Sequence, residues 1–414
     1  MKSSLAEFAQ TWWIRHQRSP LRVARWLLSW LLMGTAMLLL TPLALAARLA
    51  GVRFLGINTA RIGHLAAEPD CFAKERLLGL HRGIRPFACA PAGKVANAAL
   101  LDCWRPHIRW IGAPWLCALL KPLEWHPLLA FNVSSYTAVP KQGGGCGYIA
   151  LARRWNGRDP VLALPPAAGP AGAAALRQLG LPEGAWFVCV HNRGGGYAAH
   201  DEAWHAYRNC AIDTYLPAME RIAEAGGWCI RIGDASLAPL PPARNAIDYA
   251  HHPLKSDWLD LYLLAHCRFF LGNSSGPFLV AALFNRPVAL ANMIPIEAVL
   301  PYGARDLGIP KLLQRDGRTG CLSFAEMFSD PSSRYHFSAQ FAQDGLRILD
   351  NSPAEIRALA EEMLQRLDGS ANDSAQDAHR QARFRQLLRP QHVSYGSASR
   401  IGRDFLARHQ DLLP

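Results

Sequence analysis

The stretch of residues 186–197 constrains the fold of this chain most strongly. It opens with Phe187–Val190, a short uncharged run of β-favouring residues, which is the pattern of a strand buried on both faces of a parallel sheet. The run ends abruptly in His191, Asn192 and Arg193, and three glycines follow. Ligands of open parallel sheets bind beyond the carboxyl ends of the strands, so these polar residues are predicted at a ligand-binding edge. The alternative is a glycine turn with a solvated arginine.

A second strand–turn–helix unit occupies residues 268–292. Phe269–Leu271 is predicted to be a strand, Gly272–Gly276 a tight turn and Phe278–Phe284 a short buried helix, followed by another strand at Pro287–Ala291. Backbone N–H groups and two serine hydroxyls gather at the start of the helix, an arrangement that binds anions. The alternative is an ordinary turn between strand and helix, without a ligand.

A third predicted strand, Trp228–Ile232, ends in Gly233 and Asp234. The alternation of strands and helices through this half of the chain indicates an α/β domain with a parallel sheet. Three strand ends would then bring Arg193, Asp234 and the Ser274–Ser275 pair to one crevice. The fork of an arginine suits phosphate oxygens, so this crevice is a candidate phosphate site.

The N-terminal end of the chain is both basic and apolar. Leu27–Ala47 is a run of 21 residues without a charge, long enough to span a bilayer, although Pro42 lies within it. Residues 1–61 hold eight cationic side chains and one acidic one, which supplies seven units of the net charge of +12. The basic excess therefore belongs to a membrane-associated end, and no nucleic-acid partner is predicted. Arginines flank the run on both sides, so a spanning helix and a monotopic anchor both stay open.

Cysteine and histidine usage argues against a disulfide framework and against a metal site. The ten cysteines show no Cys-x-x-Cys pair, and several fall in predicted core strands, as in a reduced cytoplasmic domain. His200, Asp201 and His205 have metal-like spacing, but no third ligand is in register, so no metal is predicted.

The first half of the chain also begins as strand and helix. Val52–Ile57 is predicted to be a strand that runs into a turn, Asn58–Leu65, with a helix from Pro69 onward. The aromatic-rich segment Pro114–Val139 is predicted to be a membrane-proximal helical pair. Pro160–Pro170 is rich in proline and reads as an interdomain linker.

Several of these segments together resemble fucosyltransferase-type GT-B glycosyltransferases, and more closely a bacterial family of surface-polysaccharide glycosyltransferases. The resemblance covers nearly the whole chain after residue 55. The sequence departs from the fucosyltransferases at Gly194–Gly196, where many carry a second arginine, so GDP-fucose is not specified as the donor. The segments that carry the resemblance are Ala60–Leu65 with Glu68–Asp70, His191–Tyr197, Arg231–Asp234, Ile247–His251 with Ser256–Trp258, Phe269–Gly276 and Arg400–Leu406.

The resemblance implies an α/β fold of GT-B type, in which two Rossmann-like domains face each other across a cleft, behind an N-terminal membrane-anchoring helix. The implied division has four parts. They are a basic, hydrophobic membrane anchor (1–50), an N-terminal acceptor domain (51–160), a C-terminal nucleotide-sugar domain (161–370), and a linker with a C-terminal helix (371–414).

The resemblance also implies the chemistry and the residues that carry it. The reaction is transfer of a sugar from a nucleotide-sugar donor to a glycan or lipid-linked acceptor, with no metal and no other cofactor. The base that deprotonates the acceptor is expected from the N-terminal domain, as His64 or Glu68; the alternative is that His64 is a packed helix-start histidine. The expected donor-binding residues are His191, Arg193, Gly194, Tyr197, Asp234, Ser274, Ser275 and Gly276, with Arg193 also counted as catalytic.

Two other functions fit parts of the sequence. Gly272–Gly276 satisfies Gly-x-Ser-x-Gly, so an α/β-hydrolase with Ser274 as nucleophile is possible on pattern alone. It is disfavoured because no convincing pair of strands is predicted after Ala291 to carry the acid and the histidine. A non-catalytic membrane-bound scaffold is the third reading. Soluble nucleotide sugars are cytoplasmic, so a monotopic anchor in the inner membrane, with the domains facing the cytoplasm, is the predicted location.

Overall fold

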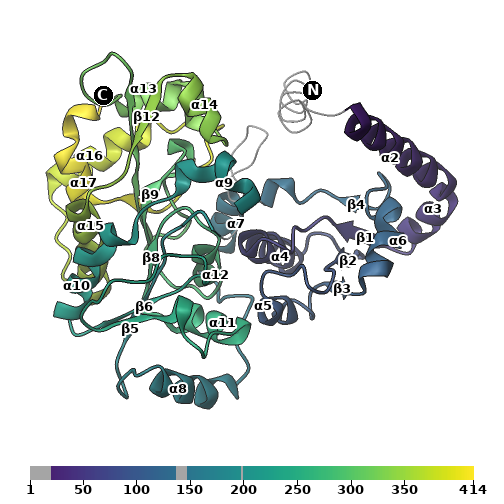
Figure 1. The fold of residues 1–414 in the computed structure, drawn as a ribbon, viewed down its shortest axis with the longest axis horizontal. Coiled ribbons are helices and arrows are strands. Elements are labelled where there is room, and N and C mark those ends of the chain that lie inside the picture. Colours follow the sequence, from purple (N-terminus) through teal and green to yellow (C-terminus); the bar gives the residue numbers. More distant parts are fainter. Residues whose placement is uncertain (1–19, 137–146, 197–198) are drawn as a thin grey trace.

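The computed structural model describes residues 20–136, 147–196 and 199–414, and it contains two separate parallel sheets (Figure 1). The first sheet has four strands in the order β3-β2-β1-β4. The second has seven in the order β13-β10-β9-β8-β5-β6-β7. The predicted α/β class with two parallel units is therefore confirmed.

The first sheet is short and lies in the N-terminal half of the chain. Its strands are β1 (Val52–Leu55), β2 (Arg85–Cys89), β3 (Arg109–Ile111) and β4 (Ala130–Phe131), all parallel. The helices of this half are α4 (Ile62–Leu77), α5 (Ala98–Cys103), α6 (Pro114–Glu124) and α7 (Gly147–Trp155). The predicted helical pair at 114–139 is wrong, because α6 is followed by β4 and a single 3-10 turn, Ser134–Tyr136; residues 137–139 lie outside the described part.

Helix α4 begins seven residues before the predicted start at Pro69. A proline is common in the first turn of a helix, but here Pro69 lies inside the helix and cannot donate a hydrogen bond to the carbonyl of Leu65. The buried indole of Trp104 supplies that bond, since its Nε1–H donates to the Leu65 oxygen at 3.0 Å. The longer helix places His64 and Glu68 four residues apart on one face.

Most of the buried apolar side chains lie in the half of the chain that carries the second sheet. Its parallel strands are β5 (Phe187–Val190), β6 (Trp228–Arg231), β7 (Ala246–Asp248), β8 (Phe270–Gly272), β9 (Val288–Met293), β10 (Leu307–Pro310) and β13 (Arg400–Ile401). Strands β5, β8 and β9 are buried at every position, as their uncharged sequences predict. The helices packed around this sheet include α8 (Ala168–Gln178), α9 (Ala199–His205), α10 (Leu216–Glu224), α11 (Asp257–His266), α12 (Pro277–Leu283) and α15 (Pro353–Asp368).

The expectation that no strand pair follows Ala291 is wrong. Strands β10 and β13 extend the second sheet, while β11 (Leu312–Arg315) and β12 (Leu346–Leu349) form a separate antiparallel pair. The remaining C-terminal helices are α13 (Phe324–Ser329), α14 (Ser338–Gln343), α16 (Ala375–Gln386) and α17 (Arg403–Arg408). The strands required for a hydrolase sheet are therefore present, and the hydrolase reading depends on the geometry around Ser274.

The N-terminal apolar run forms two helices that bend at Leu40. Helix α2 (Pro20–Leu39) and helix α3 (Thr41–Leu49) are bent by 57°. Among the described residues no single helix is long and apolar enough to cross a membrane, but this bent pair meets the criteria of length and composition together. Pro42 lies in the first turn of α3, where its missing N–H is not needed, so it starts the second helix.

The two halves of the molecule touch through helix starts. Helix α4 packs against α12, and α5 packs against α11. The amide of Asn97 donates to the backbone oxygen of Asp257 at 2.9 Å, and the Asp257 carboxylate accepts from the Ala98 N–H at 2.7 Å. Asp257 thus helps to cap α5 from the opposite half, which fixes how the two sheets face each other.

The tightest contact between the halves is backbone against backbone. A Cβ atom added to Gly276 would lie 2.7 Å from the Gly63 nitrogen and 2.7 Å from a methyl of Ile62. Gly276 has a helical φ of −54°, a conformation that alanine also adopts. The only obstacle to alanine is therefore the steric clash with Ile62 and Gly63. Glycine is needed here because α4 and α12 begin against one another.

We expect Gly276→Ala to lower the free energy of unfolding by about 1–3 kcal/mol, the usual cost of overpacking. The measurement is the melting temperature by differential scanning fluorimetry. Gly169→Ala on α8 is the matched control, because nothing lies within 4 Å of its added Cβ. Equal melting temperatures for the two variants would show that the halves separate freely at this contact.

Candidate functional site

The order of strands marks one crevice in each sheet. In the second sheet the chain runs outward from β5 to β6 and β7, then returns to the other side of β5 for β8. The carboxyl ends of β5 and β8 therefore flank a topological switch point, where ligands of open α/β sheets bind. The loops that leave these two ends are His191–Arg193 and Asn273–Gly276. The prediction that these segments lie together is confirmed, and β6, which ends next to β5, adds Asp234.

The first sheet has the same arrangement. Its chain runs from β1 to β2 and β3 on one side, and β4 returns to the other side of β1. The loop that leaves β1 leads into the start of α4, which carries Gly63 and His64. Because Gly63 contacts Gly276, the two switch-point loops meet. This meeting brings the residues predicted for the acceptor side next to those predicted for the donor side.

Arg193 is held by one end of its guanidinium and by its backbone. Its Nη1 atom donates to the Asn209 side-chain oxygen and, at 3.3 Å, to the His205 carbonyl. Its N–H donates at 3.2 Å to the Asn273 side-chain oxygen, which anchors the loop after β5 to the loop after β8. Within the described residues, Nε and Nη2 of Arg193 make no hydrogen bond, so half of the fork is available to a ligand.

The surroundings of Arg193 are positive on balance, because Arg208 and Arg61 act on it against one nearby carboxylate, Glu202. Burial and the neighbouring Arg208 lower the pKa of Arg193 to about 10, so the side chain is cationic at neutral pH with its charge incompletely balanced. Arg61, at the cap of α4 in the other half, also lowers this pKa. Burial, Arg208 and Arg193 lower the pKa of His205 to about 4, so this histidine is neutral. Cationic groups from both halves therefore act on one point, and an anion there would relieve their repulsion.

Two asparagines organise these arginines, and the sequence pattern did not single them out. Asn273 is fully buried; its amide donates to the Arg208 carbonyl at 2.9 Å while its oxygen accepts from Arg193. Asn209 accepts from Arg193 and donates at 2.6 Å to the Glu202 carboxylate. Asn273 lies within the predicted turn Gly272–Gly276 after β8. Asn209 and Arg208 lie in a segment whose sequence has no pattern that indicates a binding site.

His191 and Ser275 form a hydrogen-bonded pair. His191 Nδ1 donates to the Ile232 carbonyl at 3.1 Å, so Nε2 accepts from the Ser275 hydroxyl at 3.0 Å. Burial lowers the pKa of His191 to about 4, which keeps the imidazole neutral. His191 thus ties the strand ends of β5, β6 and β8 together.

The geometry does not support a hydrolase that uses Ser274. The Ser274 hydroxyl is shielded from solvent and has no hydrogen-bond partner in the described part of the chain, so no base activates it. The histidine contacts Ser275 instead, and its other nitrogen faces a backbone carbonyl where a Ser-His-Asp triad requires a carboxylate. The strands needed for a hydrolase sheet exist, but the described residues form no triad around Ser274.

The other predicted donor-side residues have the following placements. Asp234 caps its own loop, because its carboxylate accepts from the Ser236 N–H at 2.9 Å. Gly194 follows Arg193, and a Cβ there would lie 2.7 Å from Leu237 of the loop after β6. Gly276 packs against Gly63, and Tyr197 lies outside the described residues. The loops after β5 and β6 therefore touch on the side away from β8.

His64 and Glu68 form a dyad on the first turns of α4. The His64 Nδ1 atom lies 2.6 Å from a Glu68 oxygen, the His64 side chain is 41% exposed, and the Glu68 side chain is 3% exposed. The carboxylate accepts from Nδ1–H and so selects the tautomer that leaves Nε2 as an acceptor. No hydrogen bond to Nε2 occurs among the residues described. The alternative reading of His64 as a packed helix-start histidine is right about its place at the start of α4, but the side chain is half-exposed and is oriented by Glu68.

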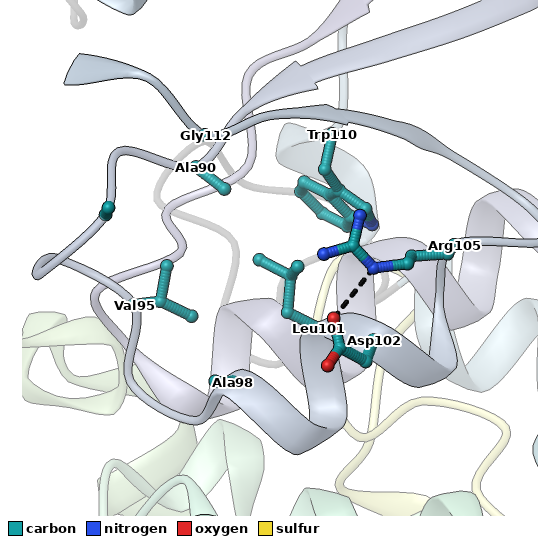
Figure 2. A pocket seen from close by; sticks show the side chains of 9 residues that line it. Ala90, Val95, Ala98, Leu101, Asp102, Arg105, Trp110 and Gly112 are labelled. Atoms are coloured by element: carbon teal, nitrogen blue, oxygen red, sulfur yellow. Dashed lines mark hydrogen bonds and ion pairs between the residues drawn. The ribbon is translucent and has the colours of Figure 1, made fainter.

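A small apolar cavity lies beside this edge of the first sheet (Figure 2). It has a volume of about 320 Å³ and opens where β2 and β3 end, in front of α5. The Asp102–Arg105 pair borders it, with atoms 2.7 Å apart. The indole N–H of Trp110 in its wall has no partner in the described structure. The cavity is lined by Ala90, Ala92, Val95, Ala98, Leu101, Asp102, Arg105, Trp110 and Gly112.

Within the described ranges no group of three histidine, cysteine or acidic side chains could hold a metal ion. His205, one of the residues with metal-like spacing, donates from Nδ1–H to the His336 carbonyl, 3.0 Å away. None of the nine described cysteines forms a disulfide with another described cysteine.

The fold and the loops define a two-sheet α/β protein whose switch-point loops face one another, and solved structures of this general kind are known. The chain is 16% identical to Escherichia coli ADP-heptose LPS heptosyltransferase II, covering 77% of this chain and 100% of that one, with a TM-score of 0.43. It is 15% identical to the iron-containing dodecameric glycosyltransferase TibC from enterotoxigenic E. coli, covering 77% of both chains, with a TM-score of 0.42. It is 8% identical to a family 9 glycosyltransferase from Veillonella parvula, covering 57% of this chain and 79% of that one, with a TM-score of 0.36.

These likenesses are too distant to carry an argument about function. No family model matches the sequence, and no curated protein matches it. The functional conclusion therefore rests on the site itself.

Proposed function

We propose that this protein is a glycosyltransferase that moves a sugar from a nucleotide-sugar donor to a surface-polysaccharide or lipid-linked acceptor. The observation that carries the proposal is the meeting of the two switch-point loops at Gly63 and Gly276. One loop presents a positive site built on Arg193, and the other presents a histidine–carboxylate dyad. A leaving diphosphate and an acceptor hydroxyl require these two kinds of group.

The donor is proposed to bind at the second sheet, in a GT-B arrangement of two Rossmann-like domains. Arg193 holds the diphosphate through its unused nitrogens, and Arg208 and Arg61 add to the positive field there. The positive field stabilises the diphosphate more strongly in the transition state, because the leaving diphosphate gains negative charge there. Three arginines can supply the charge that a metal ion supplies in other transferases, so we propose that the reaction needs no metal.

The acceptor is proposed to bind at the first sheet. His64 Nε2 takes the proton of the attacking hydroxyl, and Glu68 stabilises the imidazolium that forms. The cavity beside β2 and β3 offers an indole wall, which suits the apolar face of a sugar ring. Trp110 is therefore proposed to bind the acceptor sugar.

The protein is proposed to act at the cytoplasmic face of the inner membrane, anchored by α2 and α3. The support is the uncharged run Leu27–Ala47, the excess of arginine around it, and the exposure of its leucines. Soluble nucleotide sugars are made in the cytoplasm, which sets the side on which the domains lie.

We expect one nucleoside diphosphate to raise the melting temperature of the purified protein. Binding at a hundred times the dissociation constant stabilises the folded state by about 2.7 kcal/mol. The measurement is a thermal-shift screen with UDP, GDP, ADP, CDP and CMP, repeated with Arg193→Ala, which should lose the shift. Absence of any shift, together with labelling of Ser275 by a fluorophosphonate, would replace the transferase proposal with a hydrolase.

A further inference from the structure

The exposed apolar side chains of this protein are concentrated at one end. Fourteen of the seventeen large apolar side chains that are strongly exposed in the described part of the chain belong to α2, α3 and α6 with its C-terminal cap. Figure 1 shows these helices together at the right-hand end of the molecule, on the far side of the first sheet from the second. The fourteen are Leu21, Leu27, Leu28, Trp30, Leu31, Leu32, Leu38, Leu39, Leu43, Leu45, Leu49, Trp115, Leu119 and Trp125.

Helix α6 belongs to the folded domain, yet its outer face is apolar. Trp115 is 69% exposed and Leu119 is 65% exposed, although a helix that covers a sheet normally turns polar residues outward. The inner face is anchored, since Cys117 is buried and its thiol donates to the Ile111 carbonyl at 3.1 Å. The exposed cation nearest this face, Lys121, lies 4.9 Å above the ring of Trp125. The composition of the outer face is that of an interfacial helix, aromatic and basic.

The N-terminal helices are fixed to the same edge as α6. The rings of Trp30 and Trp125 lie 5.8 Å apart, and the Arg48 guanidinium donates to the Leu128 carbonyl at 2.9 Å. Ala44 of α3 is fully buried against Phe54 of β1. Helix α3 is therefore packed on the first sheet, and α2, α3 and α6 present one continuous surface.

We infer that α6 is a second bilayer-contacting helix, which with α2 and α3 seats the first sheet on one leaflet of a membrane. A bilayer fits better than a protein partner, because six consecutive residues of α2, 27–32, are exposed and carry no charge. A partner protein covers one face of a helix, whereas lipid surrounds it. The cations that border the surface, Arg25, Arg48 and Lys121, suit anionic headgroups.

The contact of α6 with the membrane would also place the cavity near the lipid surface. Helix α6 begins at Pro114, two residues after Gly112, which lines the cavity next to β2 and β3. The apolar face of α6 therefore leads from the membrane anchor to the cavity. This consequence rests on the proposed transferase function, whereas the contact of α6 with lipid rests only on the proposed membrane association.

The test places a photo-reactive benzoyl-phenylalanine at position 31, 77 or 119 of the full-length protein, reconstituted with vesicles of phosphatidylethanolamine and phosphatidylglycerol. Leu31, Leu77 and Leu119 are 67%, 58% and 65% exposed, so the three positions are matched in exposure. We expect cross-links to lipid from position 31 on α2 and position 119 on α6, and none from position 77 at the end of α4. Cross-links to lipid from 31 but not from 119 would overturn the inference and leave the anchor intact.

Other outcomes are equally decisive. Cross-links from position 119 to a second copy of the chain would make α6 a dimer interface and overturn the inference. Failure of the protein to float with vesicles would overturn the proposed membrane association itself.

As a second measurement, Leu119→Glu should lower the vesicle partition coefficient about tenfold, because a charge is unfavourable among lipids. Leu77→Glu should leave the coefficient unchanged; an equal loss in both variants would attribute the effect to charge alone.

Discussion

Replacing Arg193 with alanine should lower kcat/KM for sugar transfer by about 30- to 1,000-fold. The lost contact is charge-assisted and strengthens as the diphosphate leaves, which corresponds to roughly 2–4 kcal/mol of transition-state stabilisation. Arg193→Lys should recover part of the loss, because a point charge cannot reproduce the planar fork that reaches Asn209 and the ligand together. The measurement is steady-state kinetics with the donor identified by thermal shift.

The structure also predicts the milder variants in this series. Ser274→Ala should lower kcat/KM less than either Arg193 variant, because the Ser274 hydroxyl has no hydrogen-bond partner in the described structure. Arg318→Ala, which removes a surface arginine paired with Glu326 in the same half, controls for net charge and should leave activity unchanged. If Arg193→Ala kept near-normal activity while Ser275→Ala abolished it, the His191–Ser275 pair would be the reactive centre and the transferase proposal would fail.

The sequence predicted the centre of the second sheet well. Strands β5, β6 and β8 have local signals that agree with their environment: short uncharged runs, β-favouring residues, and a glycine or polar stop at the carboxyl end. Because these strands are adjacent in space, their stops converge, and the crevice around Arg193 follows from the sequence pattern. The expectation that these three strand ends line one crevice relied on the general rule that ligands of open α/β sheets bind beyond the carboxyl ends of the strands.

The end of the sheet formed by β10 and β13 was not predictable in the same way. Strand β13 has two residues and β10 contains a glycine and a proline, so neither carries a local strand signal. They are strands because neighbouring strands supply their hydrogen-bond partners. Likewise Asn209 and Arg208 reach Arg193 only through the fold, and no spacing in the sequence marks them.

The start of α4 shows how a local signal can mislead. Pro69 resembles a helix start, yet the helix continues through it because Trp104, distant in sequence, satisfies the freed Leu65 carbonyl. The sequence analysis predicted His64 and Glu68 as separate candidates for the base. Only the helix as observed, which begins at Ile62 and not at Pro69, shows that the two form a pair. A tertiary contact thus converts two separate candidates into one dyad.

That dyad leads to the second large effect. We expect His64→Ala to lower kcat for sugar transfer by about 100- to 10,000-fold, the usual contribution of a general base. KM for the donor should change little, because the donor binds in the other half of the molecule. The His64 side chain is 41% exposed, so added imidazole should enter the space and restore part of the activity. Steady-state kinetics with and without imidazole measures both effects.

The same helix supplies the control. His81, just beyond the far end of α4, pairs with Glu75 at 2.7 Å, and His81→Asn removes a similar histidine–carboxylate contact while tolerating the positive φ of 54° at that position. A loss of stability without a specific loss of kcat is expected there. Glu68→Gln should lower kcat less than His64→Ala, because the amide oxygen can still accept from Nδ1–H but no longer stabilises the imidazolium. If Glu68→Gln were more damaging than His64→Ala, the carboxylate itself would be the base, and His64 would only position it.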